Sequence, residues 1–202
     1  MAKYKVKDET RVPGLLSDLD YLKNADIEVG IFGSKEGSKT LMIASVHEFG
    51  TTIQAKNANA LTIPLNEEAS GKRAGEFEGL FRPNGTDILA LENADGTLKP
   101  MYVLKKSVTI PERSYIRGTF DKEYKKIESR IENAFRAVLA DRMKPKRAMG
   151  IIGEWLVTLV RRYMVQLSNP PNAEVTKSNK KGQDNPLIDS GRLRQSITYR
   201  IR

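Results

Sequence analysis

The side chains best suited to chemistry are few in this sequence, and they do not form a known catalytic pattern. The single histidine, His47, could serve as a general base, but no Gly-x-Ser-x-Gly elbow is present to position a serine nucleophile. A histidine near the end of a short helix is more often a packed or capping side chain. The 202-residue chain has no cysteine, which excludes disulfides, thiolate catalysis and cysteine zinc sites.

Acidic and glycine-rich segments offer two further options for chemistry. The adjacent carboxylates Glu67 and Glu68 could serve acid–base or magnesium chemistry, but neighbouring residues point in different directions on a helix or a strand. Gly30, Gly33 and Gly37 precede a predicted helix, but their spacing matches neither the dinucleotide-binding fingerprint nor the P-loop. We therefore predict no catalytic residues, no metal site and no cofactor.

The basic composition raises the question of nucleic-acid binding. With 34 Lys and Arg against 25 Asp and Glu, the chain has a net charge of +9, and clustered cations bind phosphate by releasing its counterions. The basic residues fall in separate groups at 105–106, 142–147, 161–162, 177–181 and 192–202, and acids are interspersed in the helical stretches between them. Two interpretations stay open: a nucleic-acid surface, or solvated and subunit-facing charge.

The elements that must position these residues can be predicted from hydrophobic spacing. Leu15, Leu19 and Leu22 lie four and three residues apart, which is typical of a short helix. Residues 26–32 alternate between apolar and other residues, as in a strand with one buried face. After a loop at 33–38, residues 40–49 predict a second helix, and Gly50 follows where glycine often ends a helix.

Residues 52–108 have a different pattern, with short apolar runs separated by turns. Asn84-Gly85 and Asp95-Gly96 favour tight turns, because Asn, Asp and Gly tolerate positive φ. The second turn separates the apolar runs 88–91 and 101–104, which predicts a β-hairpin. We interpret this block as an inserted β-rich lobe.

Two long helices are predicted in the second half of the chain. Apolar residues recur every three or four positions from Ile116 to Val138, which indicates an amphipathic helix that ends before Pro145. The next helix, at 147–167, has two apolar faces, so it is either central in the fold or in contact with another subunit. Its Trp155 falls at a core-like position and is also a candidate interface residue, with stacking on nucleic-acid bases as the less favoured alternative.

The C-terminal segment changes from an irregular to an alternating pattern. Residues 169–185 are polar and without periodicity, which predicts a flexible arm within the core domain. Residues 197–202 alternate like a strand, and its exposed Arg200 and Arg202 are candidate contacts to a phosphate or a protein partner. A flexible arm before a strand would allow that strand to pair with the sheet of a neighbouring subunit.

Together these elements predict an α+β fold, with a small mixed or antiparallel sheet packed on two long helices. We expect a core domain at 1–51 and 109–202, interrupted by the lobe at 52–108. No run approaches the roughly 18 apolar residues of a membrane span, and the start of the chain is charged. A soluble protein that is neither secreted nor bound to a membrane is therefore expected.

Three short motifs resemble, in their order, the signature of the phage tail-completion or head-to-tail joining proteins, a family also described as virion morphogenesis or minor tail proteins. The first motif is Val29-Gly30-Ile31 followed by His47-Glu48-Phe49-Gly50-Thr51. The second motif is Ile110-Pro111-Glu112-Arg113-Ser114-Tyr115-Ile116-Arg117. The third motif is Pro186-Leu187-Ile188-Asp189-Ser190-Gly191-Arg192-Leu193, followed by Ser196-Ile197-Thr198-Tyr199.

The similarity covers roughly residues 26–54 and 109–202, and it departs from the family at three places. Ser114 stands where the family usually has proline, and Ser190 stands where it has threonine. The block between the first and second motifs is much longer than the family's short link. The role of the lobe is therefore not implied by the resemblance.

The resemblance implies a structural virion protein and not an enzyme. A subunit of this family forms a ring, with six copies expected, at the head-proximal end of the tail in the phage neck, after assembly in the host cytoplasm. Its implied partners are its own copies, tail tube or terminator proteins and the head connector, with DNA passing close by. The alternatives are a nucleic-acid-binding module of a phage or prophage and a hydrolase with a carboxylate-bound metal.

Overall fold

The computed structural model describes residues 11–33, 37–180 and 184–202. Its elements, in chain order, are α1 (Val12–Asn24), β1 (Ile27–Gly30), α2 (Ser38–Phe49), β2 (Thr51–Gln54), β3 (Leu61–Pro64), the 3₁₀ turn η1 (Ala74–Glu76), β4 (Ile88–Glu92), β5 (Leu98–Lys105), β6 (Ser107–Ile110), α3 (Arg117–Leu139), α4 (Pro145–Gln166), α5 (Glu174–Asn179), α6 (Arg192–Gln195) and β7 (Thr198–Ile201). The predicted α+β class is confirmed, and every strand pair in the described residues is antiparallel.

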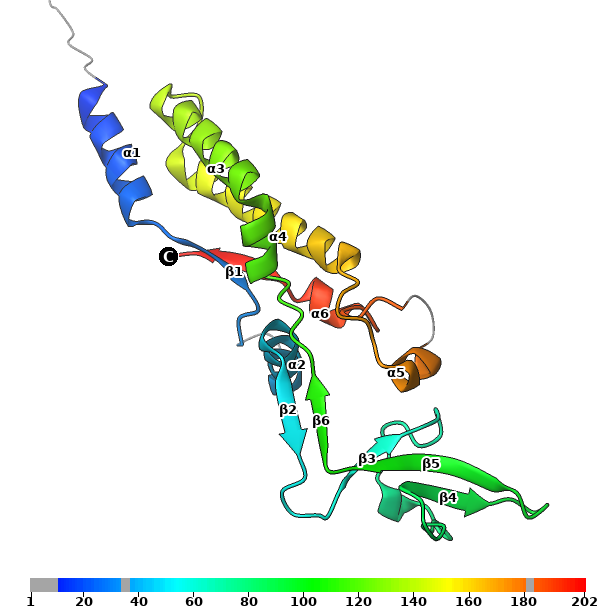
Figure 1. Cartoon of the computed structure of the whole chain (residues 1–202). Coiled ribbons are helices and arrows are strands. Elements are labelled where there is room, and N and C mark those ends of the chain that lie inside the picture. Colours follow the sequence, from blue (N-terminus) through cyan, green and yellow to red (C-terminus); the bar gives the residue numbers. More distant parts are fainter. Residues whose placement is uncertain (1–10, 34–36, 181–183) are drawn as a thin grey trace, which may run out of the picture.

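The molecule is elongated, with a helical body at one end and a β-rich lobe at the other (Figure 1). In the body, α3 and α4 form an antiparallel hairpin, and α1 packs beside it through Leu22, which shares a buried cluster with Val138 and Met149. Pro145 is the first residue of α4, where its missing N–H and fixed φ suit a helix start. No helix in the described ranges combines the length and apolar character needed to cross a membrane.

Helix α4 is the central element of the body. Its position decides whether its second apolar face is buried within the chain or contacts another subunit. One face, with Ile152, Leu156 and Leu159, packs toward α3 and β1. The other, with Val157, Val160 and Met164, packs against Tyr115, Leu187, Leu193 and Ile197. Both faces are covered within the chain, so the alternative in which the second face waits for another subunit is wrong.

The final strand β7 pairs with β1 of the same chain. The antiparallel register runs from Ile27 opposite Ile201 to Gly30 opposite Thr198. The Tyr199 ring lies against α4 at Gly153, where an added Cβ would meet the ring at 2.2 Å. The expectation that this strand would be left to pair with a neighbour's sheet is therefore wrong, because its partner strand lies near the start of its own chain.

The lobe is built on a sheet of its own in the order β3-β5-β4. The predicted hairpin at Asp95-Gly96 is confirmed, since β4 and β5 pair across it and Gly96 has a φ of +81°. The small core of the lobe contains Ala69, Met101 and Tyr102, all at most 1% exposed. The two-stranded ribbon of β2 and β6 connects this lobe to the body.

The segment predicted as a flexible arm contains the short helix α5 and several contacts to the body. The Asn185 side-chain amide donates to the carbonyls of Met164 and Val165 at 3.1 and 2.9 Å. These carbonyls belong to the last turn of α4, where no N–H within the helix is available to them. Asn185 therefore fixes the start of the third motif on α4. Residues 181–183 of this segment lie outside the described residues.

Candidate functional site

The buried carboxylate of Glu48 joins the first motif to the second. Its oxygens accept hydrogen bonds from the backbone N–H groups of Tyr115, Ile116 and Arg117, at 2.9, 2.9 and 3.0 Å. The Ser114 hydroxyl donates to the same carboxylate at 3.0 Å. Glu48 is only 4% exposed, so this contact is the joint between the end of α2 and the start of α3.

The physical reason for this joint is the unpaired start of α3. The first N–H groups of a helix lack acceptors within it, and the aligned peptide dipoles place a partial positive charge there. Ile116, the residue before α3, contributes no capping side chain. Glu48 supplies both the acceptor and the negative charge from another helix. Arg117 closes the joint by donating to the backbone carbonyl of Glu48 at 2.7 Å and by lying over the Phe49 ring.

Gly50 and Thr51 bring the first two motifs into direct backbone contact. Gly50 has a φ of +67°, and a Cβ at this position would come within 2.8 Å of the Glu112 nitrogen. A residue other than glycine would therefore push the two motifs apart. Thr51 then faces Ile110 in the β2–β6 ribbon, and Pro111, half-buried, follows at the end of β6.

Arg113 connects the second motif to the turn before α5. Its Nε donates to the carbonyl of Pro170 and a terminal nitrogen donates to the carbonyl of Pro171, both at 2.8 Å. Its backbone N–H donates to the His47 carbonyl at 2.7 Å. The residue is 5% exposed, and burial lowers the pKa of its guanidinium. Its buried charge is held by neutral carbonyl groups.

His47 lies between this arginine and the third motif as a neutral, packed side chain. Burial lowers its pKa below 6.5, and the positive charges of Arg113 and Lys180 lower it further. Its Nδ1 is buried and has no hydrogen-bond partner among the described residues. A general base must accept a proton and become an imidazolium. The two nearby cations disfavour that positive charge, and the described part of the chain offers no acceptor for a proton on Nδ1.

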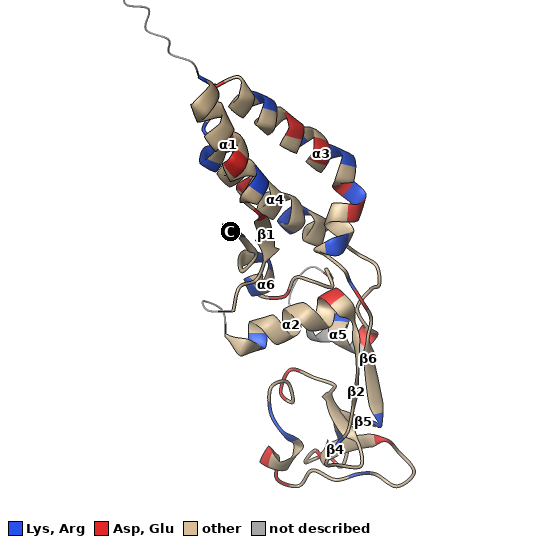
Figure 2. Cartoon of the chain, turned by 90° about the vertical axis from the view of Figure 1, so that its left-hand side faces the viewer, with Lys and Arg blue, Asp and Glu red and all other residues tan. Residues whose placement is uncertain are grey.

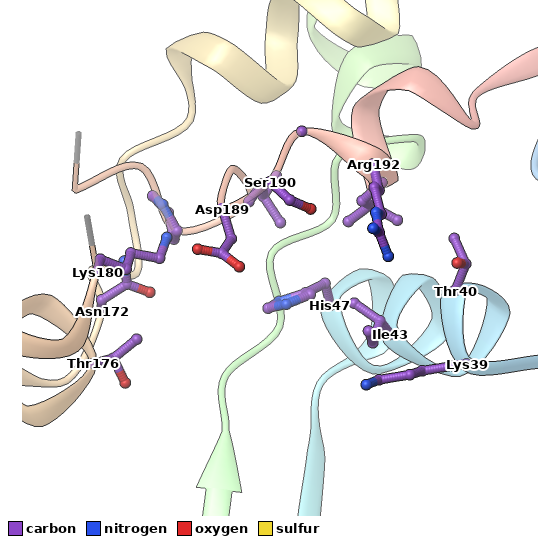
Figure 3. Close-up of a pocket in the computed structure, with 14 residues that line it drawn as sticks. Lys39, Thr40, Ile43, His47, Asn172, Thr176, Lys180, Asp189, Ser190 and Arg192 are labelled. Atoms are coloured by element: carbon purple, nitrogen blue, oxygen red, sulfur yellow. The ribbon is translucent and has the colours of Figure 1, made fainter. Parts of the chain in front are cut away.

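A cavity of about 500 Å³ lies between α2, α5 and the third motif (Figure 3). His47 lines it from the first motif, and every residue of 186–193 except Ile188 lines it from the third motif, including Pro186, Leu187, Asp189, Ser190, Gly191 and Leu193. Lys180 fixes one wall, because its ammonium donates to the carbonyls of Asn185 and Ile188. The first and third motifs thus meet at this cavity.

The remaining predicted site residues do not line the cavity. Tyr115 and Ile197 are fully buried in the core that α4 shares with the third motif, and the Ser196 hydroxyl donates to the Leu193 carbonyl. Arg200 and Arg202, expected to be free for a partner, both pair with Glu28 on the neighbouring strand β1. Trp155 is half-buried, with Arg130 of α3 over its ring.

Several residues of this site were missed by sequence reasoning. Lys39 and Thr40 line the cavity from the first turn of α2, and Asn185 and Lys180 lie in the segment interpreted as an arm. Asn185 carried a signal, since Asn followed by Pro favours a turn and Asn commonly caps helix ends. Lys180 carried none, because a lysine run is usually solvated.

The described residues include no cluster of three or more His, Asp or Glu side chains placed to hold a metal ion. Lys and Arg do not gather along the long helix α3, where they are interspersed with Asp and Glu (Figure 2). No family model, curated protein or solved structure matches this chain. The resemblance to the tail-completion proteins therefore rests on the three motifs alone.

Proposed function

We propose that this chain is a structural subunit of a tailed-phage virion, which assembles into a ring of about six copies and joins the completed tail to the head connector. The observation that supports this most is the use of the first two motifs as joints between elements. Glu48 accepts five hydrogen bonds from the second motif, and Arg113 holds the turn at 170–171. Side chains used in this way fix a scaffold and are not free for catalysis.

The shape of the chain also supports a role in assembly. A ring subunit needs two different faces, one for each neighbour. The lobe projects from the body on a narrow ribbon (Figure 1), so it can reach beyond the subunit's own body. At the opposite end, Val12, Leu16 and Leu19 form an exposed apolar stripe on α1. These two ends are the candidate faces for contacts between copies.

The decisive experiment is deletion of the gene in the phage or prophage that encodes it. Electron microscopy of the lysate should then show filled heads and tails that are separate, and purified full-length chain added to that lysate should restore joined particles. Joined, infectious particles in the absence of the protein would exclude the proposed role.

Assembly itself can be tested with one matched pair of variants. Leu16, on the stripe, is 61% exposed, and its replacement by Glu places a charge in the proposed contact at little cost to the fold. Ser17→Glu, at an exposed neighbouring position off the stripe, is the control. By light scattering after size exclusion, the unchanged chain and Ser17→Glu should approach six times the 22.7 kDa monomer mass, while Leu16→Glu should stay small. If Leu16→Glu and Ser17→Glu assembled to the same mass, α1 would not be part of the contact between copies.

A further inference from the structure

The cavity between α2, α5 and the third motif has features of a binding site that the joining role does not use. Two of its cations, Lys39 and Arg192, belong to different elements, and neither has an ion pair or a side-chain hydrogen bond within the described part of the chain. Arg192 points from α6 toward α2 in Figure 3. Two such cations beside one cavity raise the local concentration of anions.

The charged groups around the cavity are distributed unequally between its two ends. Asp189, its one acidic side chain, acts on Lys180 and raises the pKa of that ammonium, opposing the larger lowering by burial. In Figure 3, Asp189 lies on the Lys180 side of the cavity, away from Lys39. The other end is the first turn of α2, which has no capping side chain, so its backbone N–H groups add positive potential beside Lys39.

The cavity also has an apolar side and neutral donors. Ile43, Leu187 and Leu193 line it, and so do Thr40 and Ser190, which carry hydroxyl groups. A phosphate group offers no apolar surface to such a wall, whereas a carboxylate on an aliphatic stem matches both parts. The combination selects for a peptide with an acidic side chain next to an apolar one.

We infer that this cavity binds a segment of another protein through a carboxylate that Lys39 and Arg192 hold, with the adjacent apolar side chain resting on Ile43 and Leu193. The inference depends only on the residues of the cavity, so a failure to form rings would not contradict it, and a failure to bind the peptide would not contradict ring formation. The first and third motifs meet here, and occupancy of the cavity would brace α2 against α6.

The test is an NMR titration of the isotope-labelled full chain with N-acetyl-Leu-Glu-amide, and with N-acetyl-Leu-Gln-amide as the neutral counterpart. The acidic peptide should produce saturable shifts in the amides of residues 39–47 and 187–193. Replacing Lys39 and Arg192 together by Gln should weaken its binding at least about tenfold, since hydrogen bonds between charged groups are stronger than those between neutral ones. Both side chains are exposed, so the fold tolerates this change.

The control is Arg194→Gln, because Arg194 lies on α6 but does not line the cavity. It should leave the affinity for the acidic peptide unchanged. The inference is overturned if the acidic peptide gives no saturable shifts, or if the neutral peptide binds equally well. It is also overturned if Arg194→Gln weakens binding as much as the double variant, or if inorganic phosphate binds more tightly than the peptide.

Discussion

Replacing Glu48 by Gln tests whether the joint between the first and second motifs holds the body together. The substitution keeps the size of the side chain and replaces one acceptor oxygen with an NH₂ group. Whichever way the amide turns, that NH₂ faces backbone N–H groups at the start of α3 that now lack an acceptor. Re-orientation of the side chain cannot repair this, because both carboxylate oxygens accept from backbone N–H groups, which can only donate.

The magnitude follows from the number and burial of these donors. Oε2 of Glu48 accepts from Tyr115 and Ile116, and Oε1 accepts from Ser114 and Arg117. A buried donor left unsatisfied costs about 1–3 kcal/mol, and the loss of the negative charge weakens the remaining bonds. We expect Glu48→Gln to lower the free energy of unfolding by about 2–5 kcal/mol, or the melting temperature by roughly 5–15 °C for a chain of this length.

The measurement is urea unfolding followed by circular dichroism at pH 7, where the helices of the body dominate the signal. The matched control is Glu112→Gln, since Glu112 also pairs with Arg117, at 2.9 Å, but is about half exposed. An exposed ion pair contributes at most about 1 kcal/mol, so the control should stay close to the unchanged chain. If the two variants lose the same stability, or if Glu48→Gln loses less than about 0.5 kcal/mol, the capping argument is refuted.

Three further predictions follow from the same structure. Gly153→Ala should destabilise the body because its methyl group collides with Tyr199, whereas Gly14→Ala, in an open position on α1, should stabilise by about 0.5–1 kcal/mol; thermal melts of both variants check the opposite signs. His47 is the chain's one histidine, and its pKa in the folded state is lowered. The unfolded state therefore binds the proton more readily, so the free energy of unfolding should fall as the pH is lowered from 7 to below 6.5. His47→Gln should flatten this pH dependence, and an unchanged slope between pH 7 and 5.5 would contradict the burial argument. Retention of duplex DNA should be weak and lost at moderate salt, and retention that persists as salt rises would favour the nucleic-acid alternative.

The elements that could be predicted from the sequence are those set by local patterns. Helix α3 follows from apolar spacing over more than twenty residues, and the β4–β5 hairpin follows from Asp95-Gly96, which needs no distant partner. The break before Pro145 and the end of α2 at Gly50 follow from the conformational preferences of proline and glycine, although α4 begins at Pro145 and not at the predicted residue 147. Local conformational preferences and periodicity fix such features wherever the rest of the chain lies.

The features that could not be predicted depend on residues that are distant in the sequence. Nothing local indicates that Glu48 caps a helix that begins 69 residues later, or that β7 pairs with β1. The second apolar face of α4 pointed equally to a central helix and to a subunit contact, and only the position of the third motif decided this. The free arginines expected on the last strand are paired because Glu28 of β1 lies across from Arg200.

The position of the joint gives the first two motifs a common mechanical role. Thr51, directly after Gly50, begins one strand of the ribbon that carries the lobe, and Ile110 ends the other. Glu48 therefore clamps the base of the ribbon to the start of α3, and Arg113, two residues beyond Pro111, ties the same base to the turn before α5. The ribbon is only two strands wide and its lobe has a separate core. The direction in which the lobe points is thus set mainly at its base. A change in these motifs should therefore alter the orientation of the lobe and leave the surface of the lobe itself unchanged.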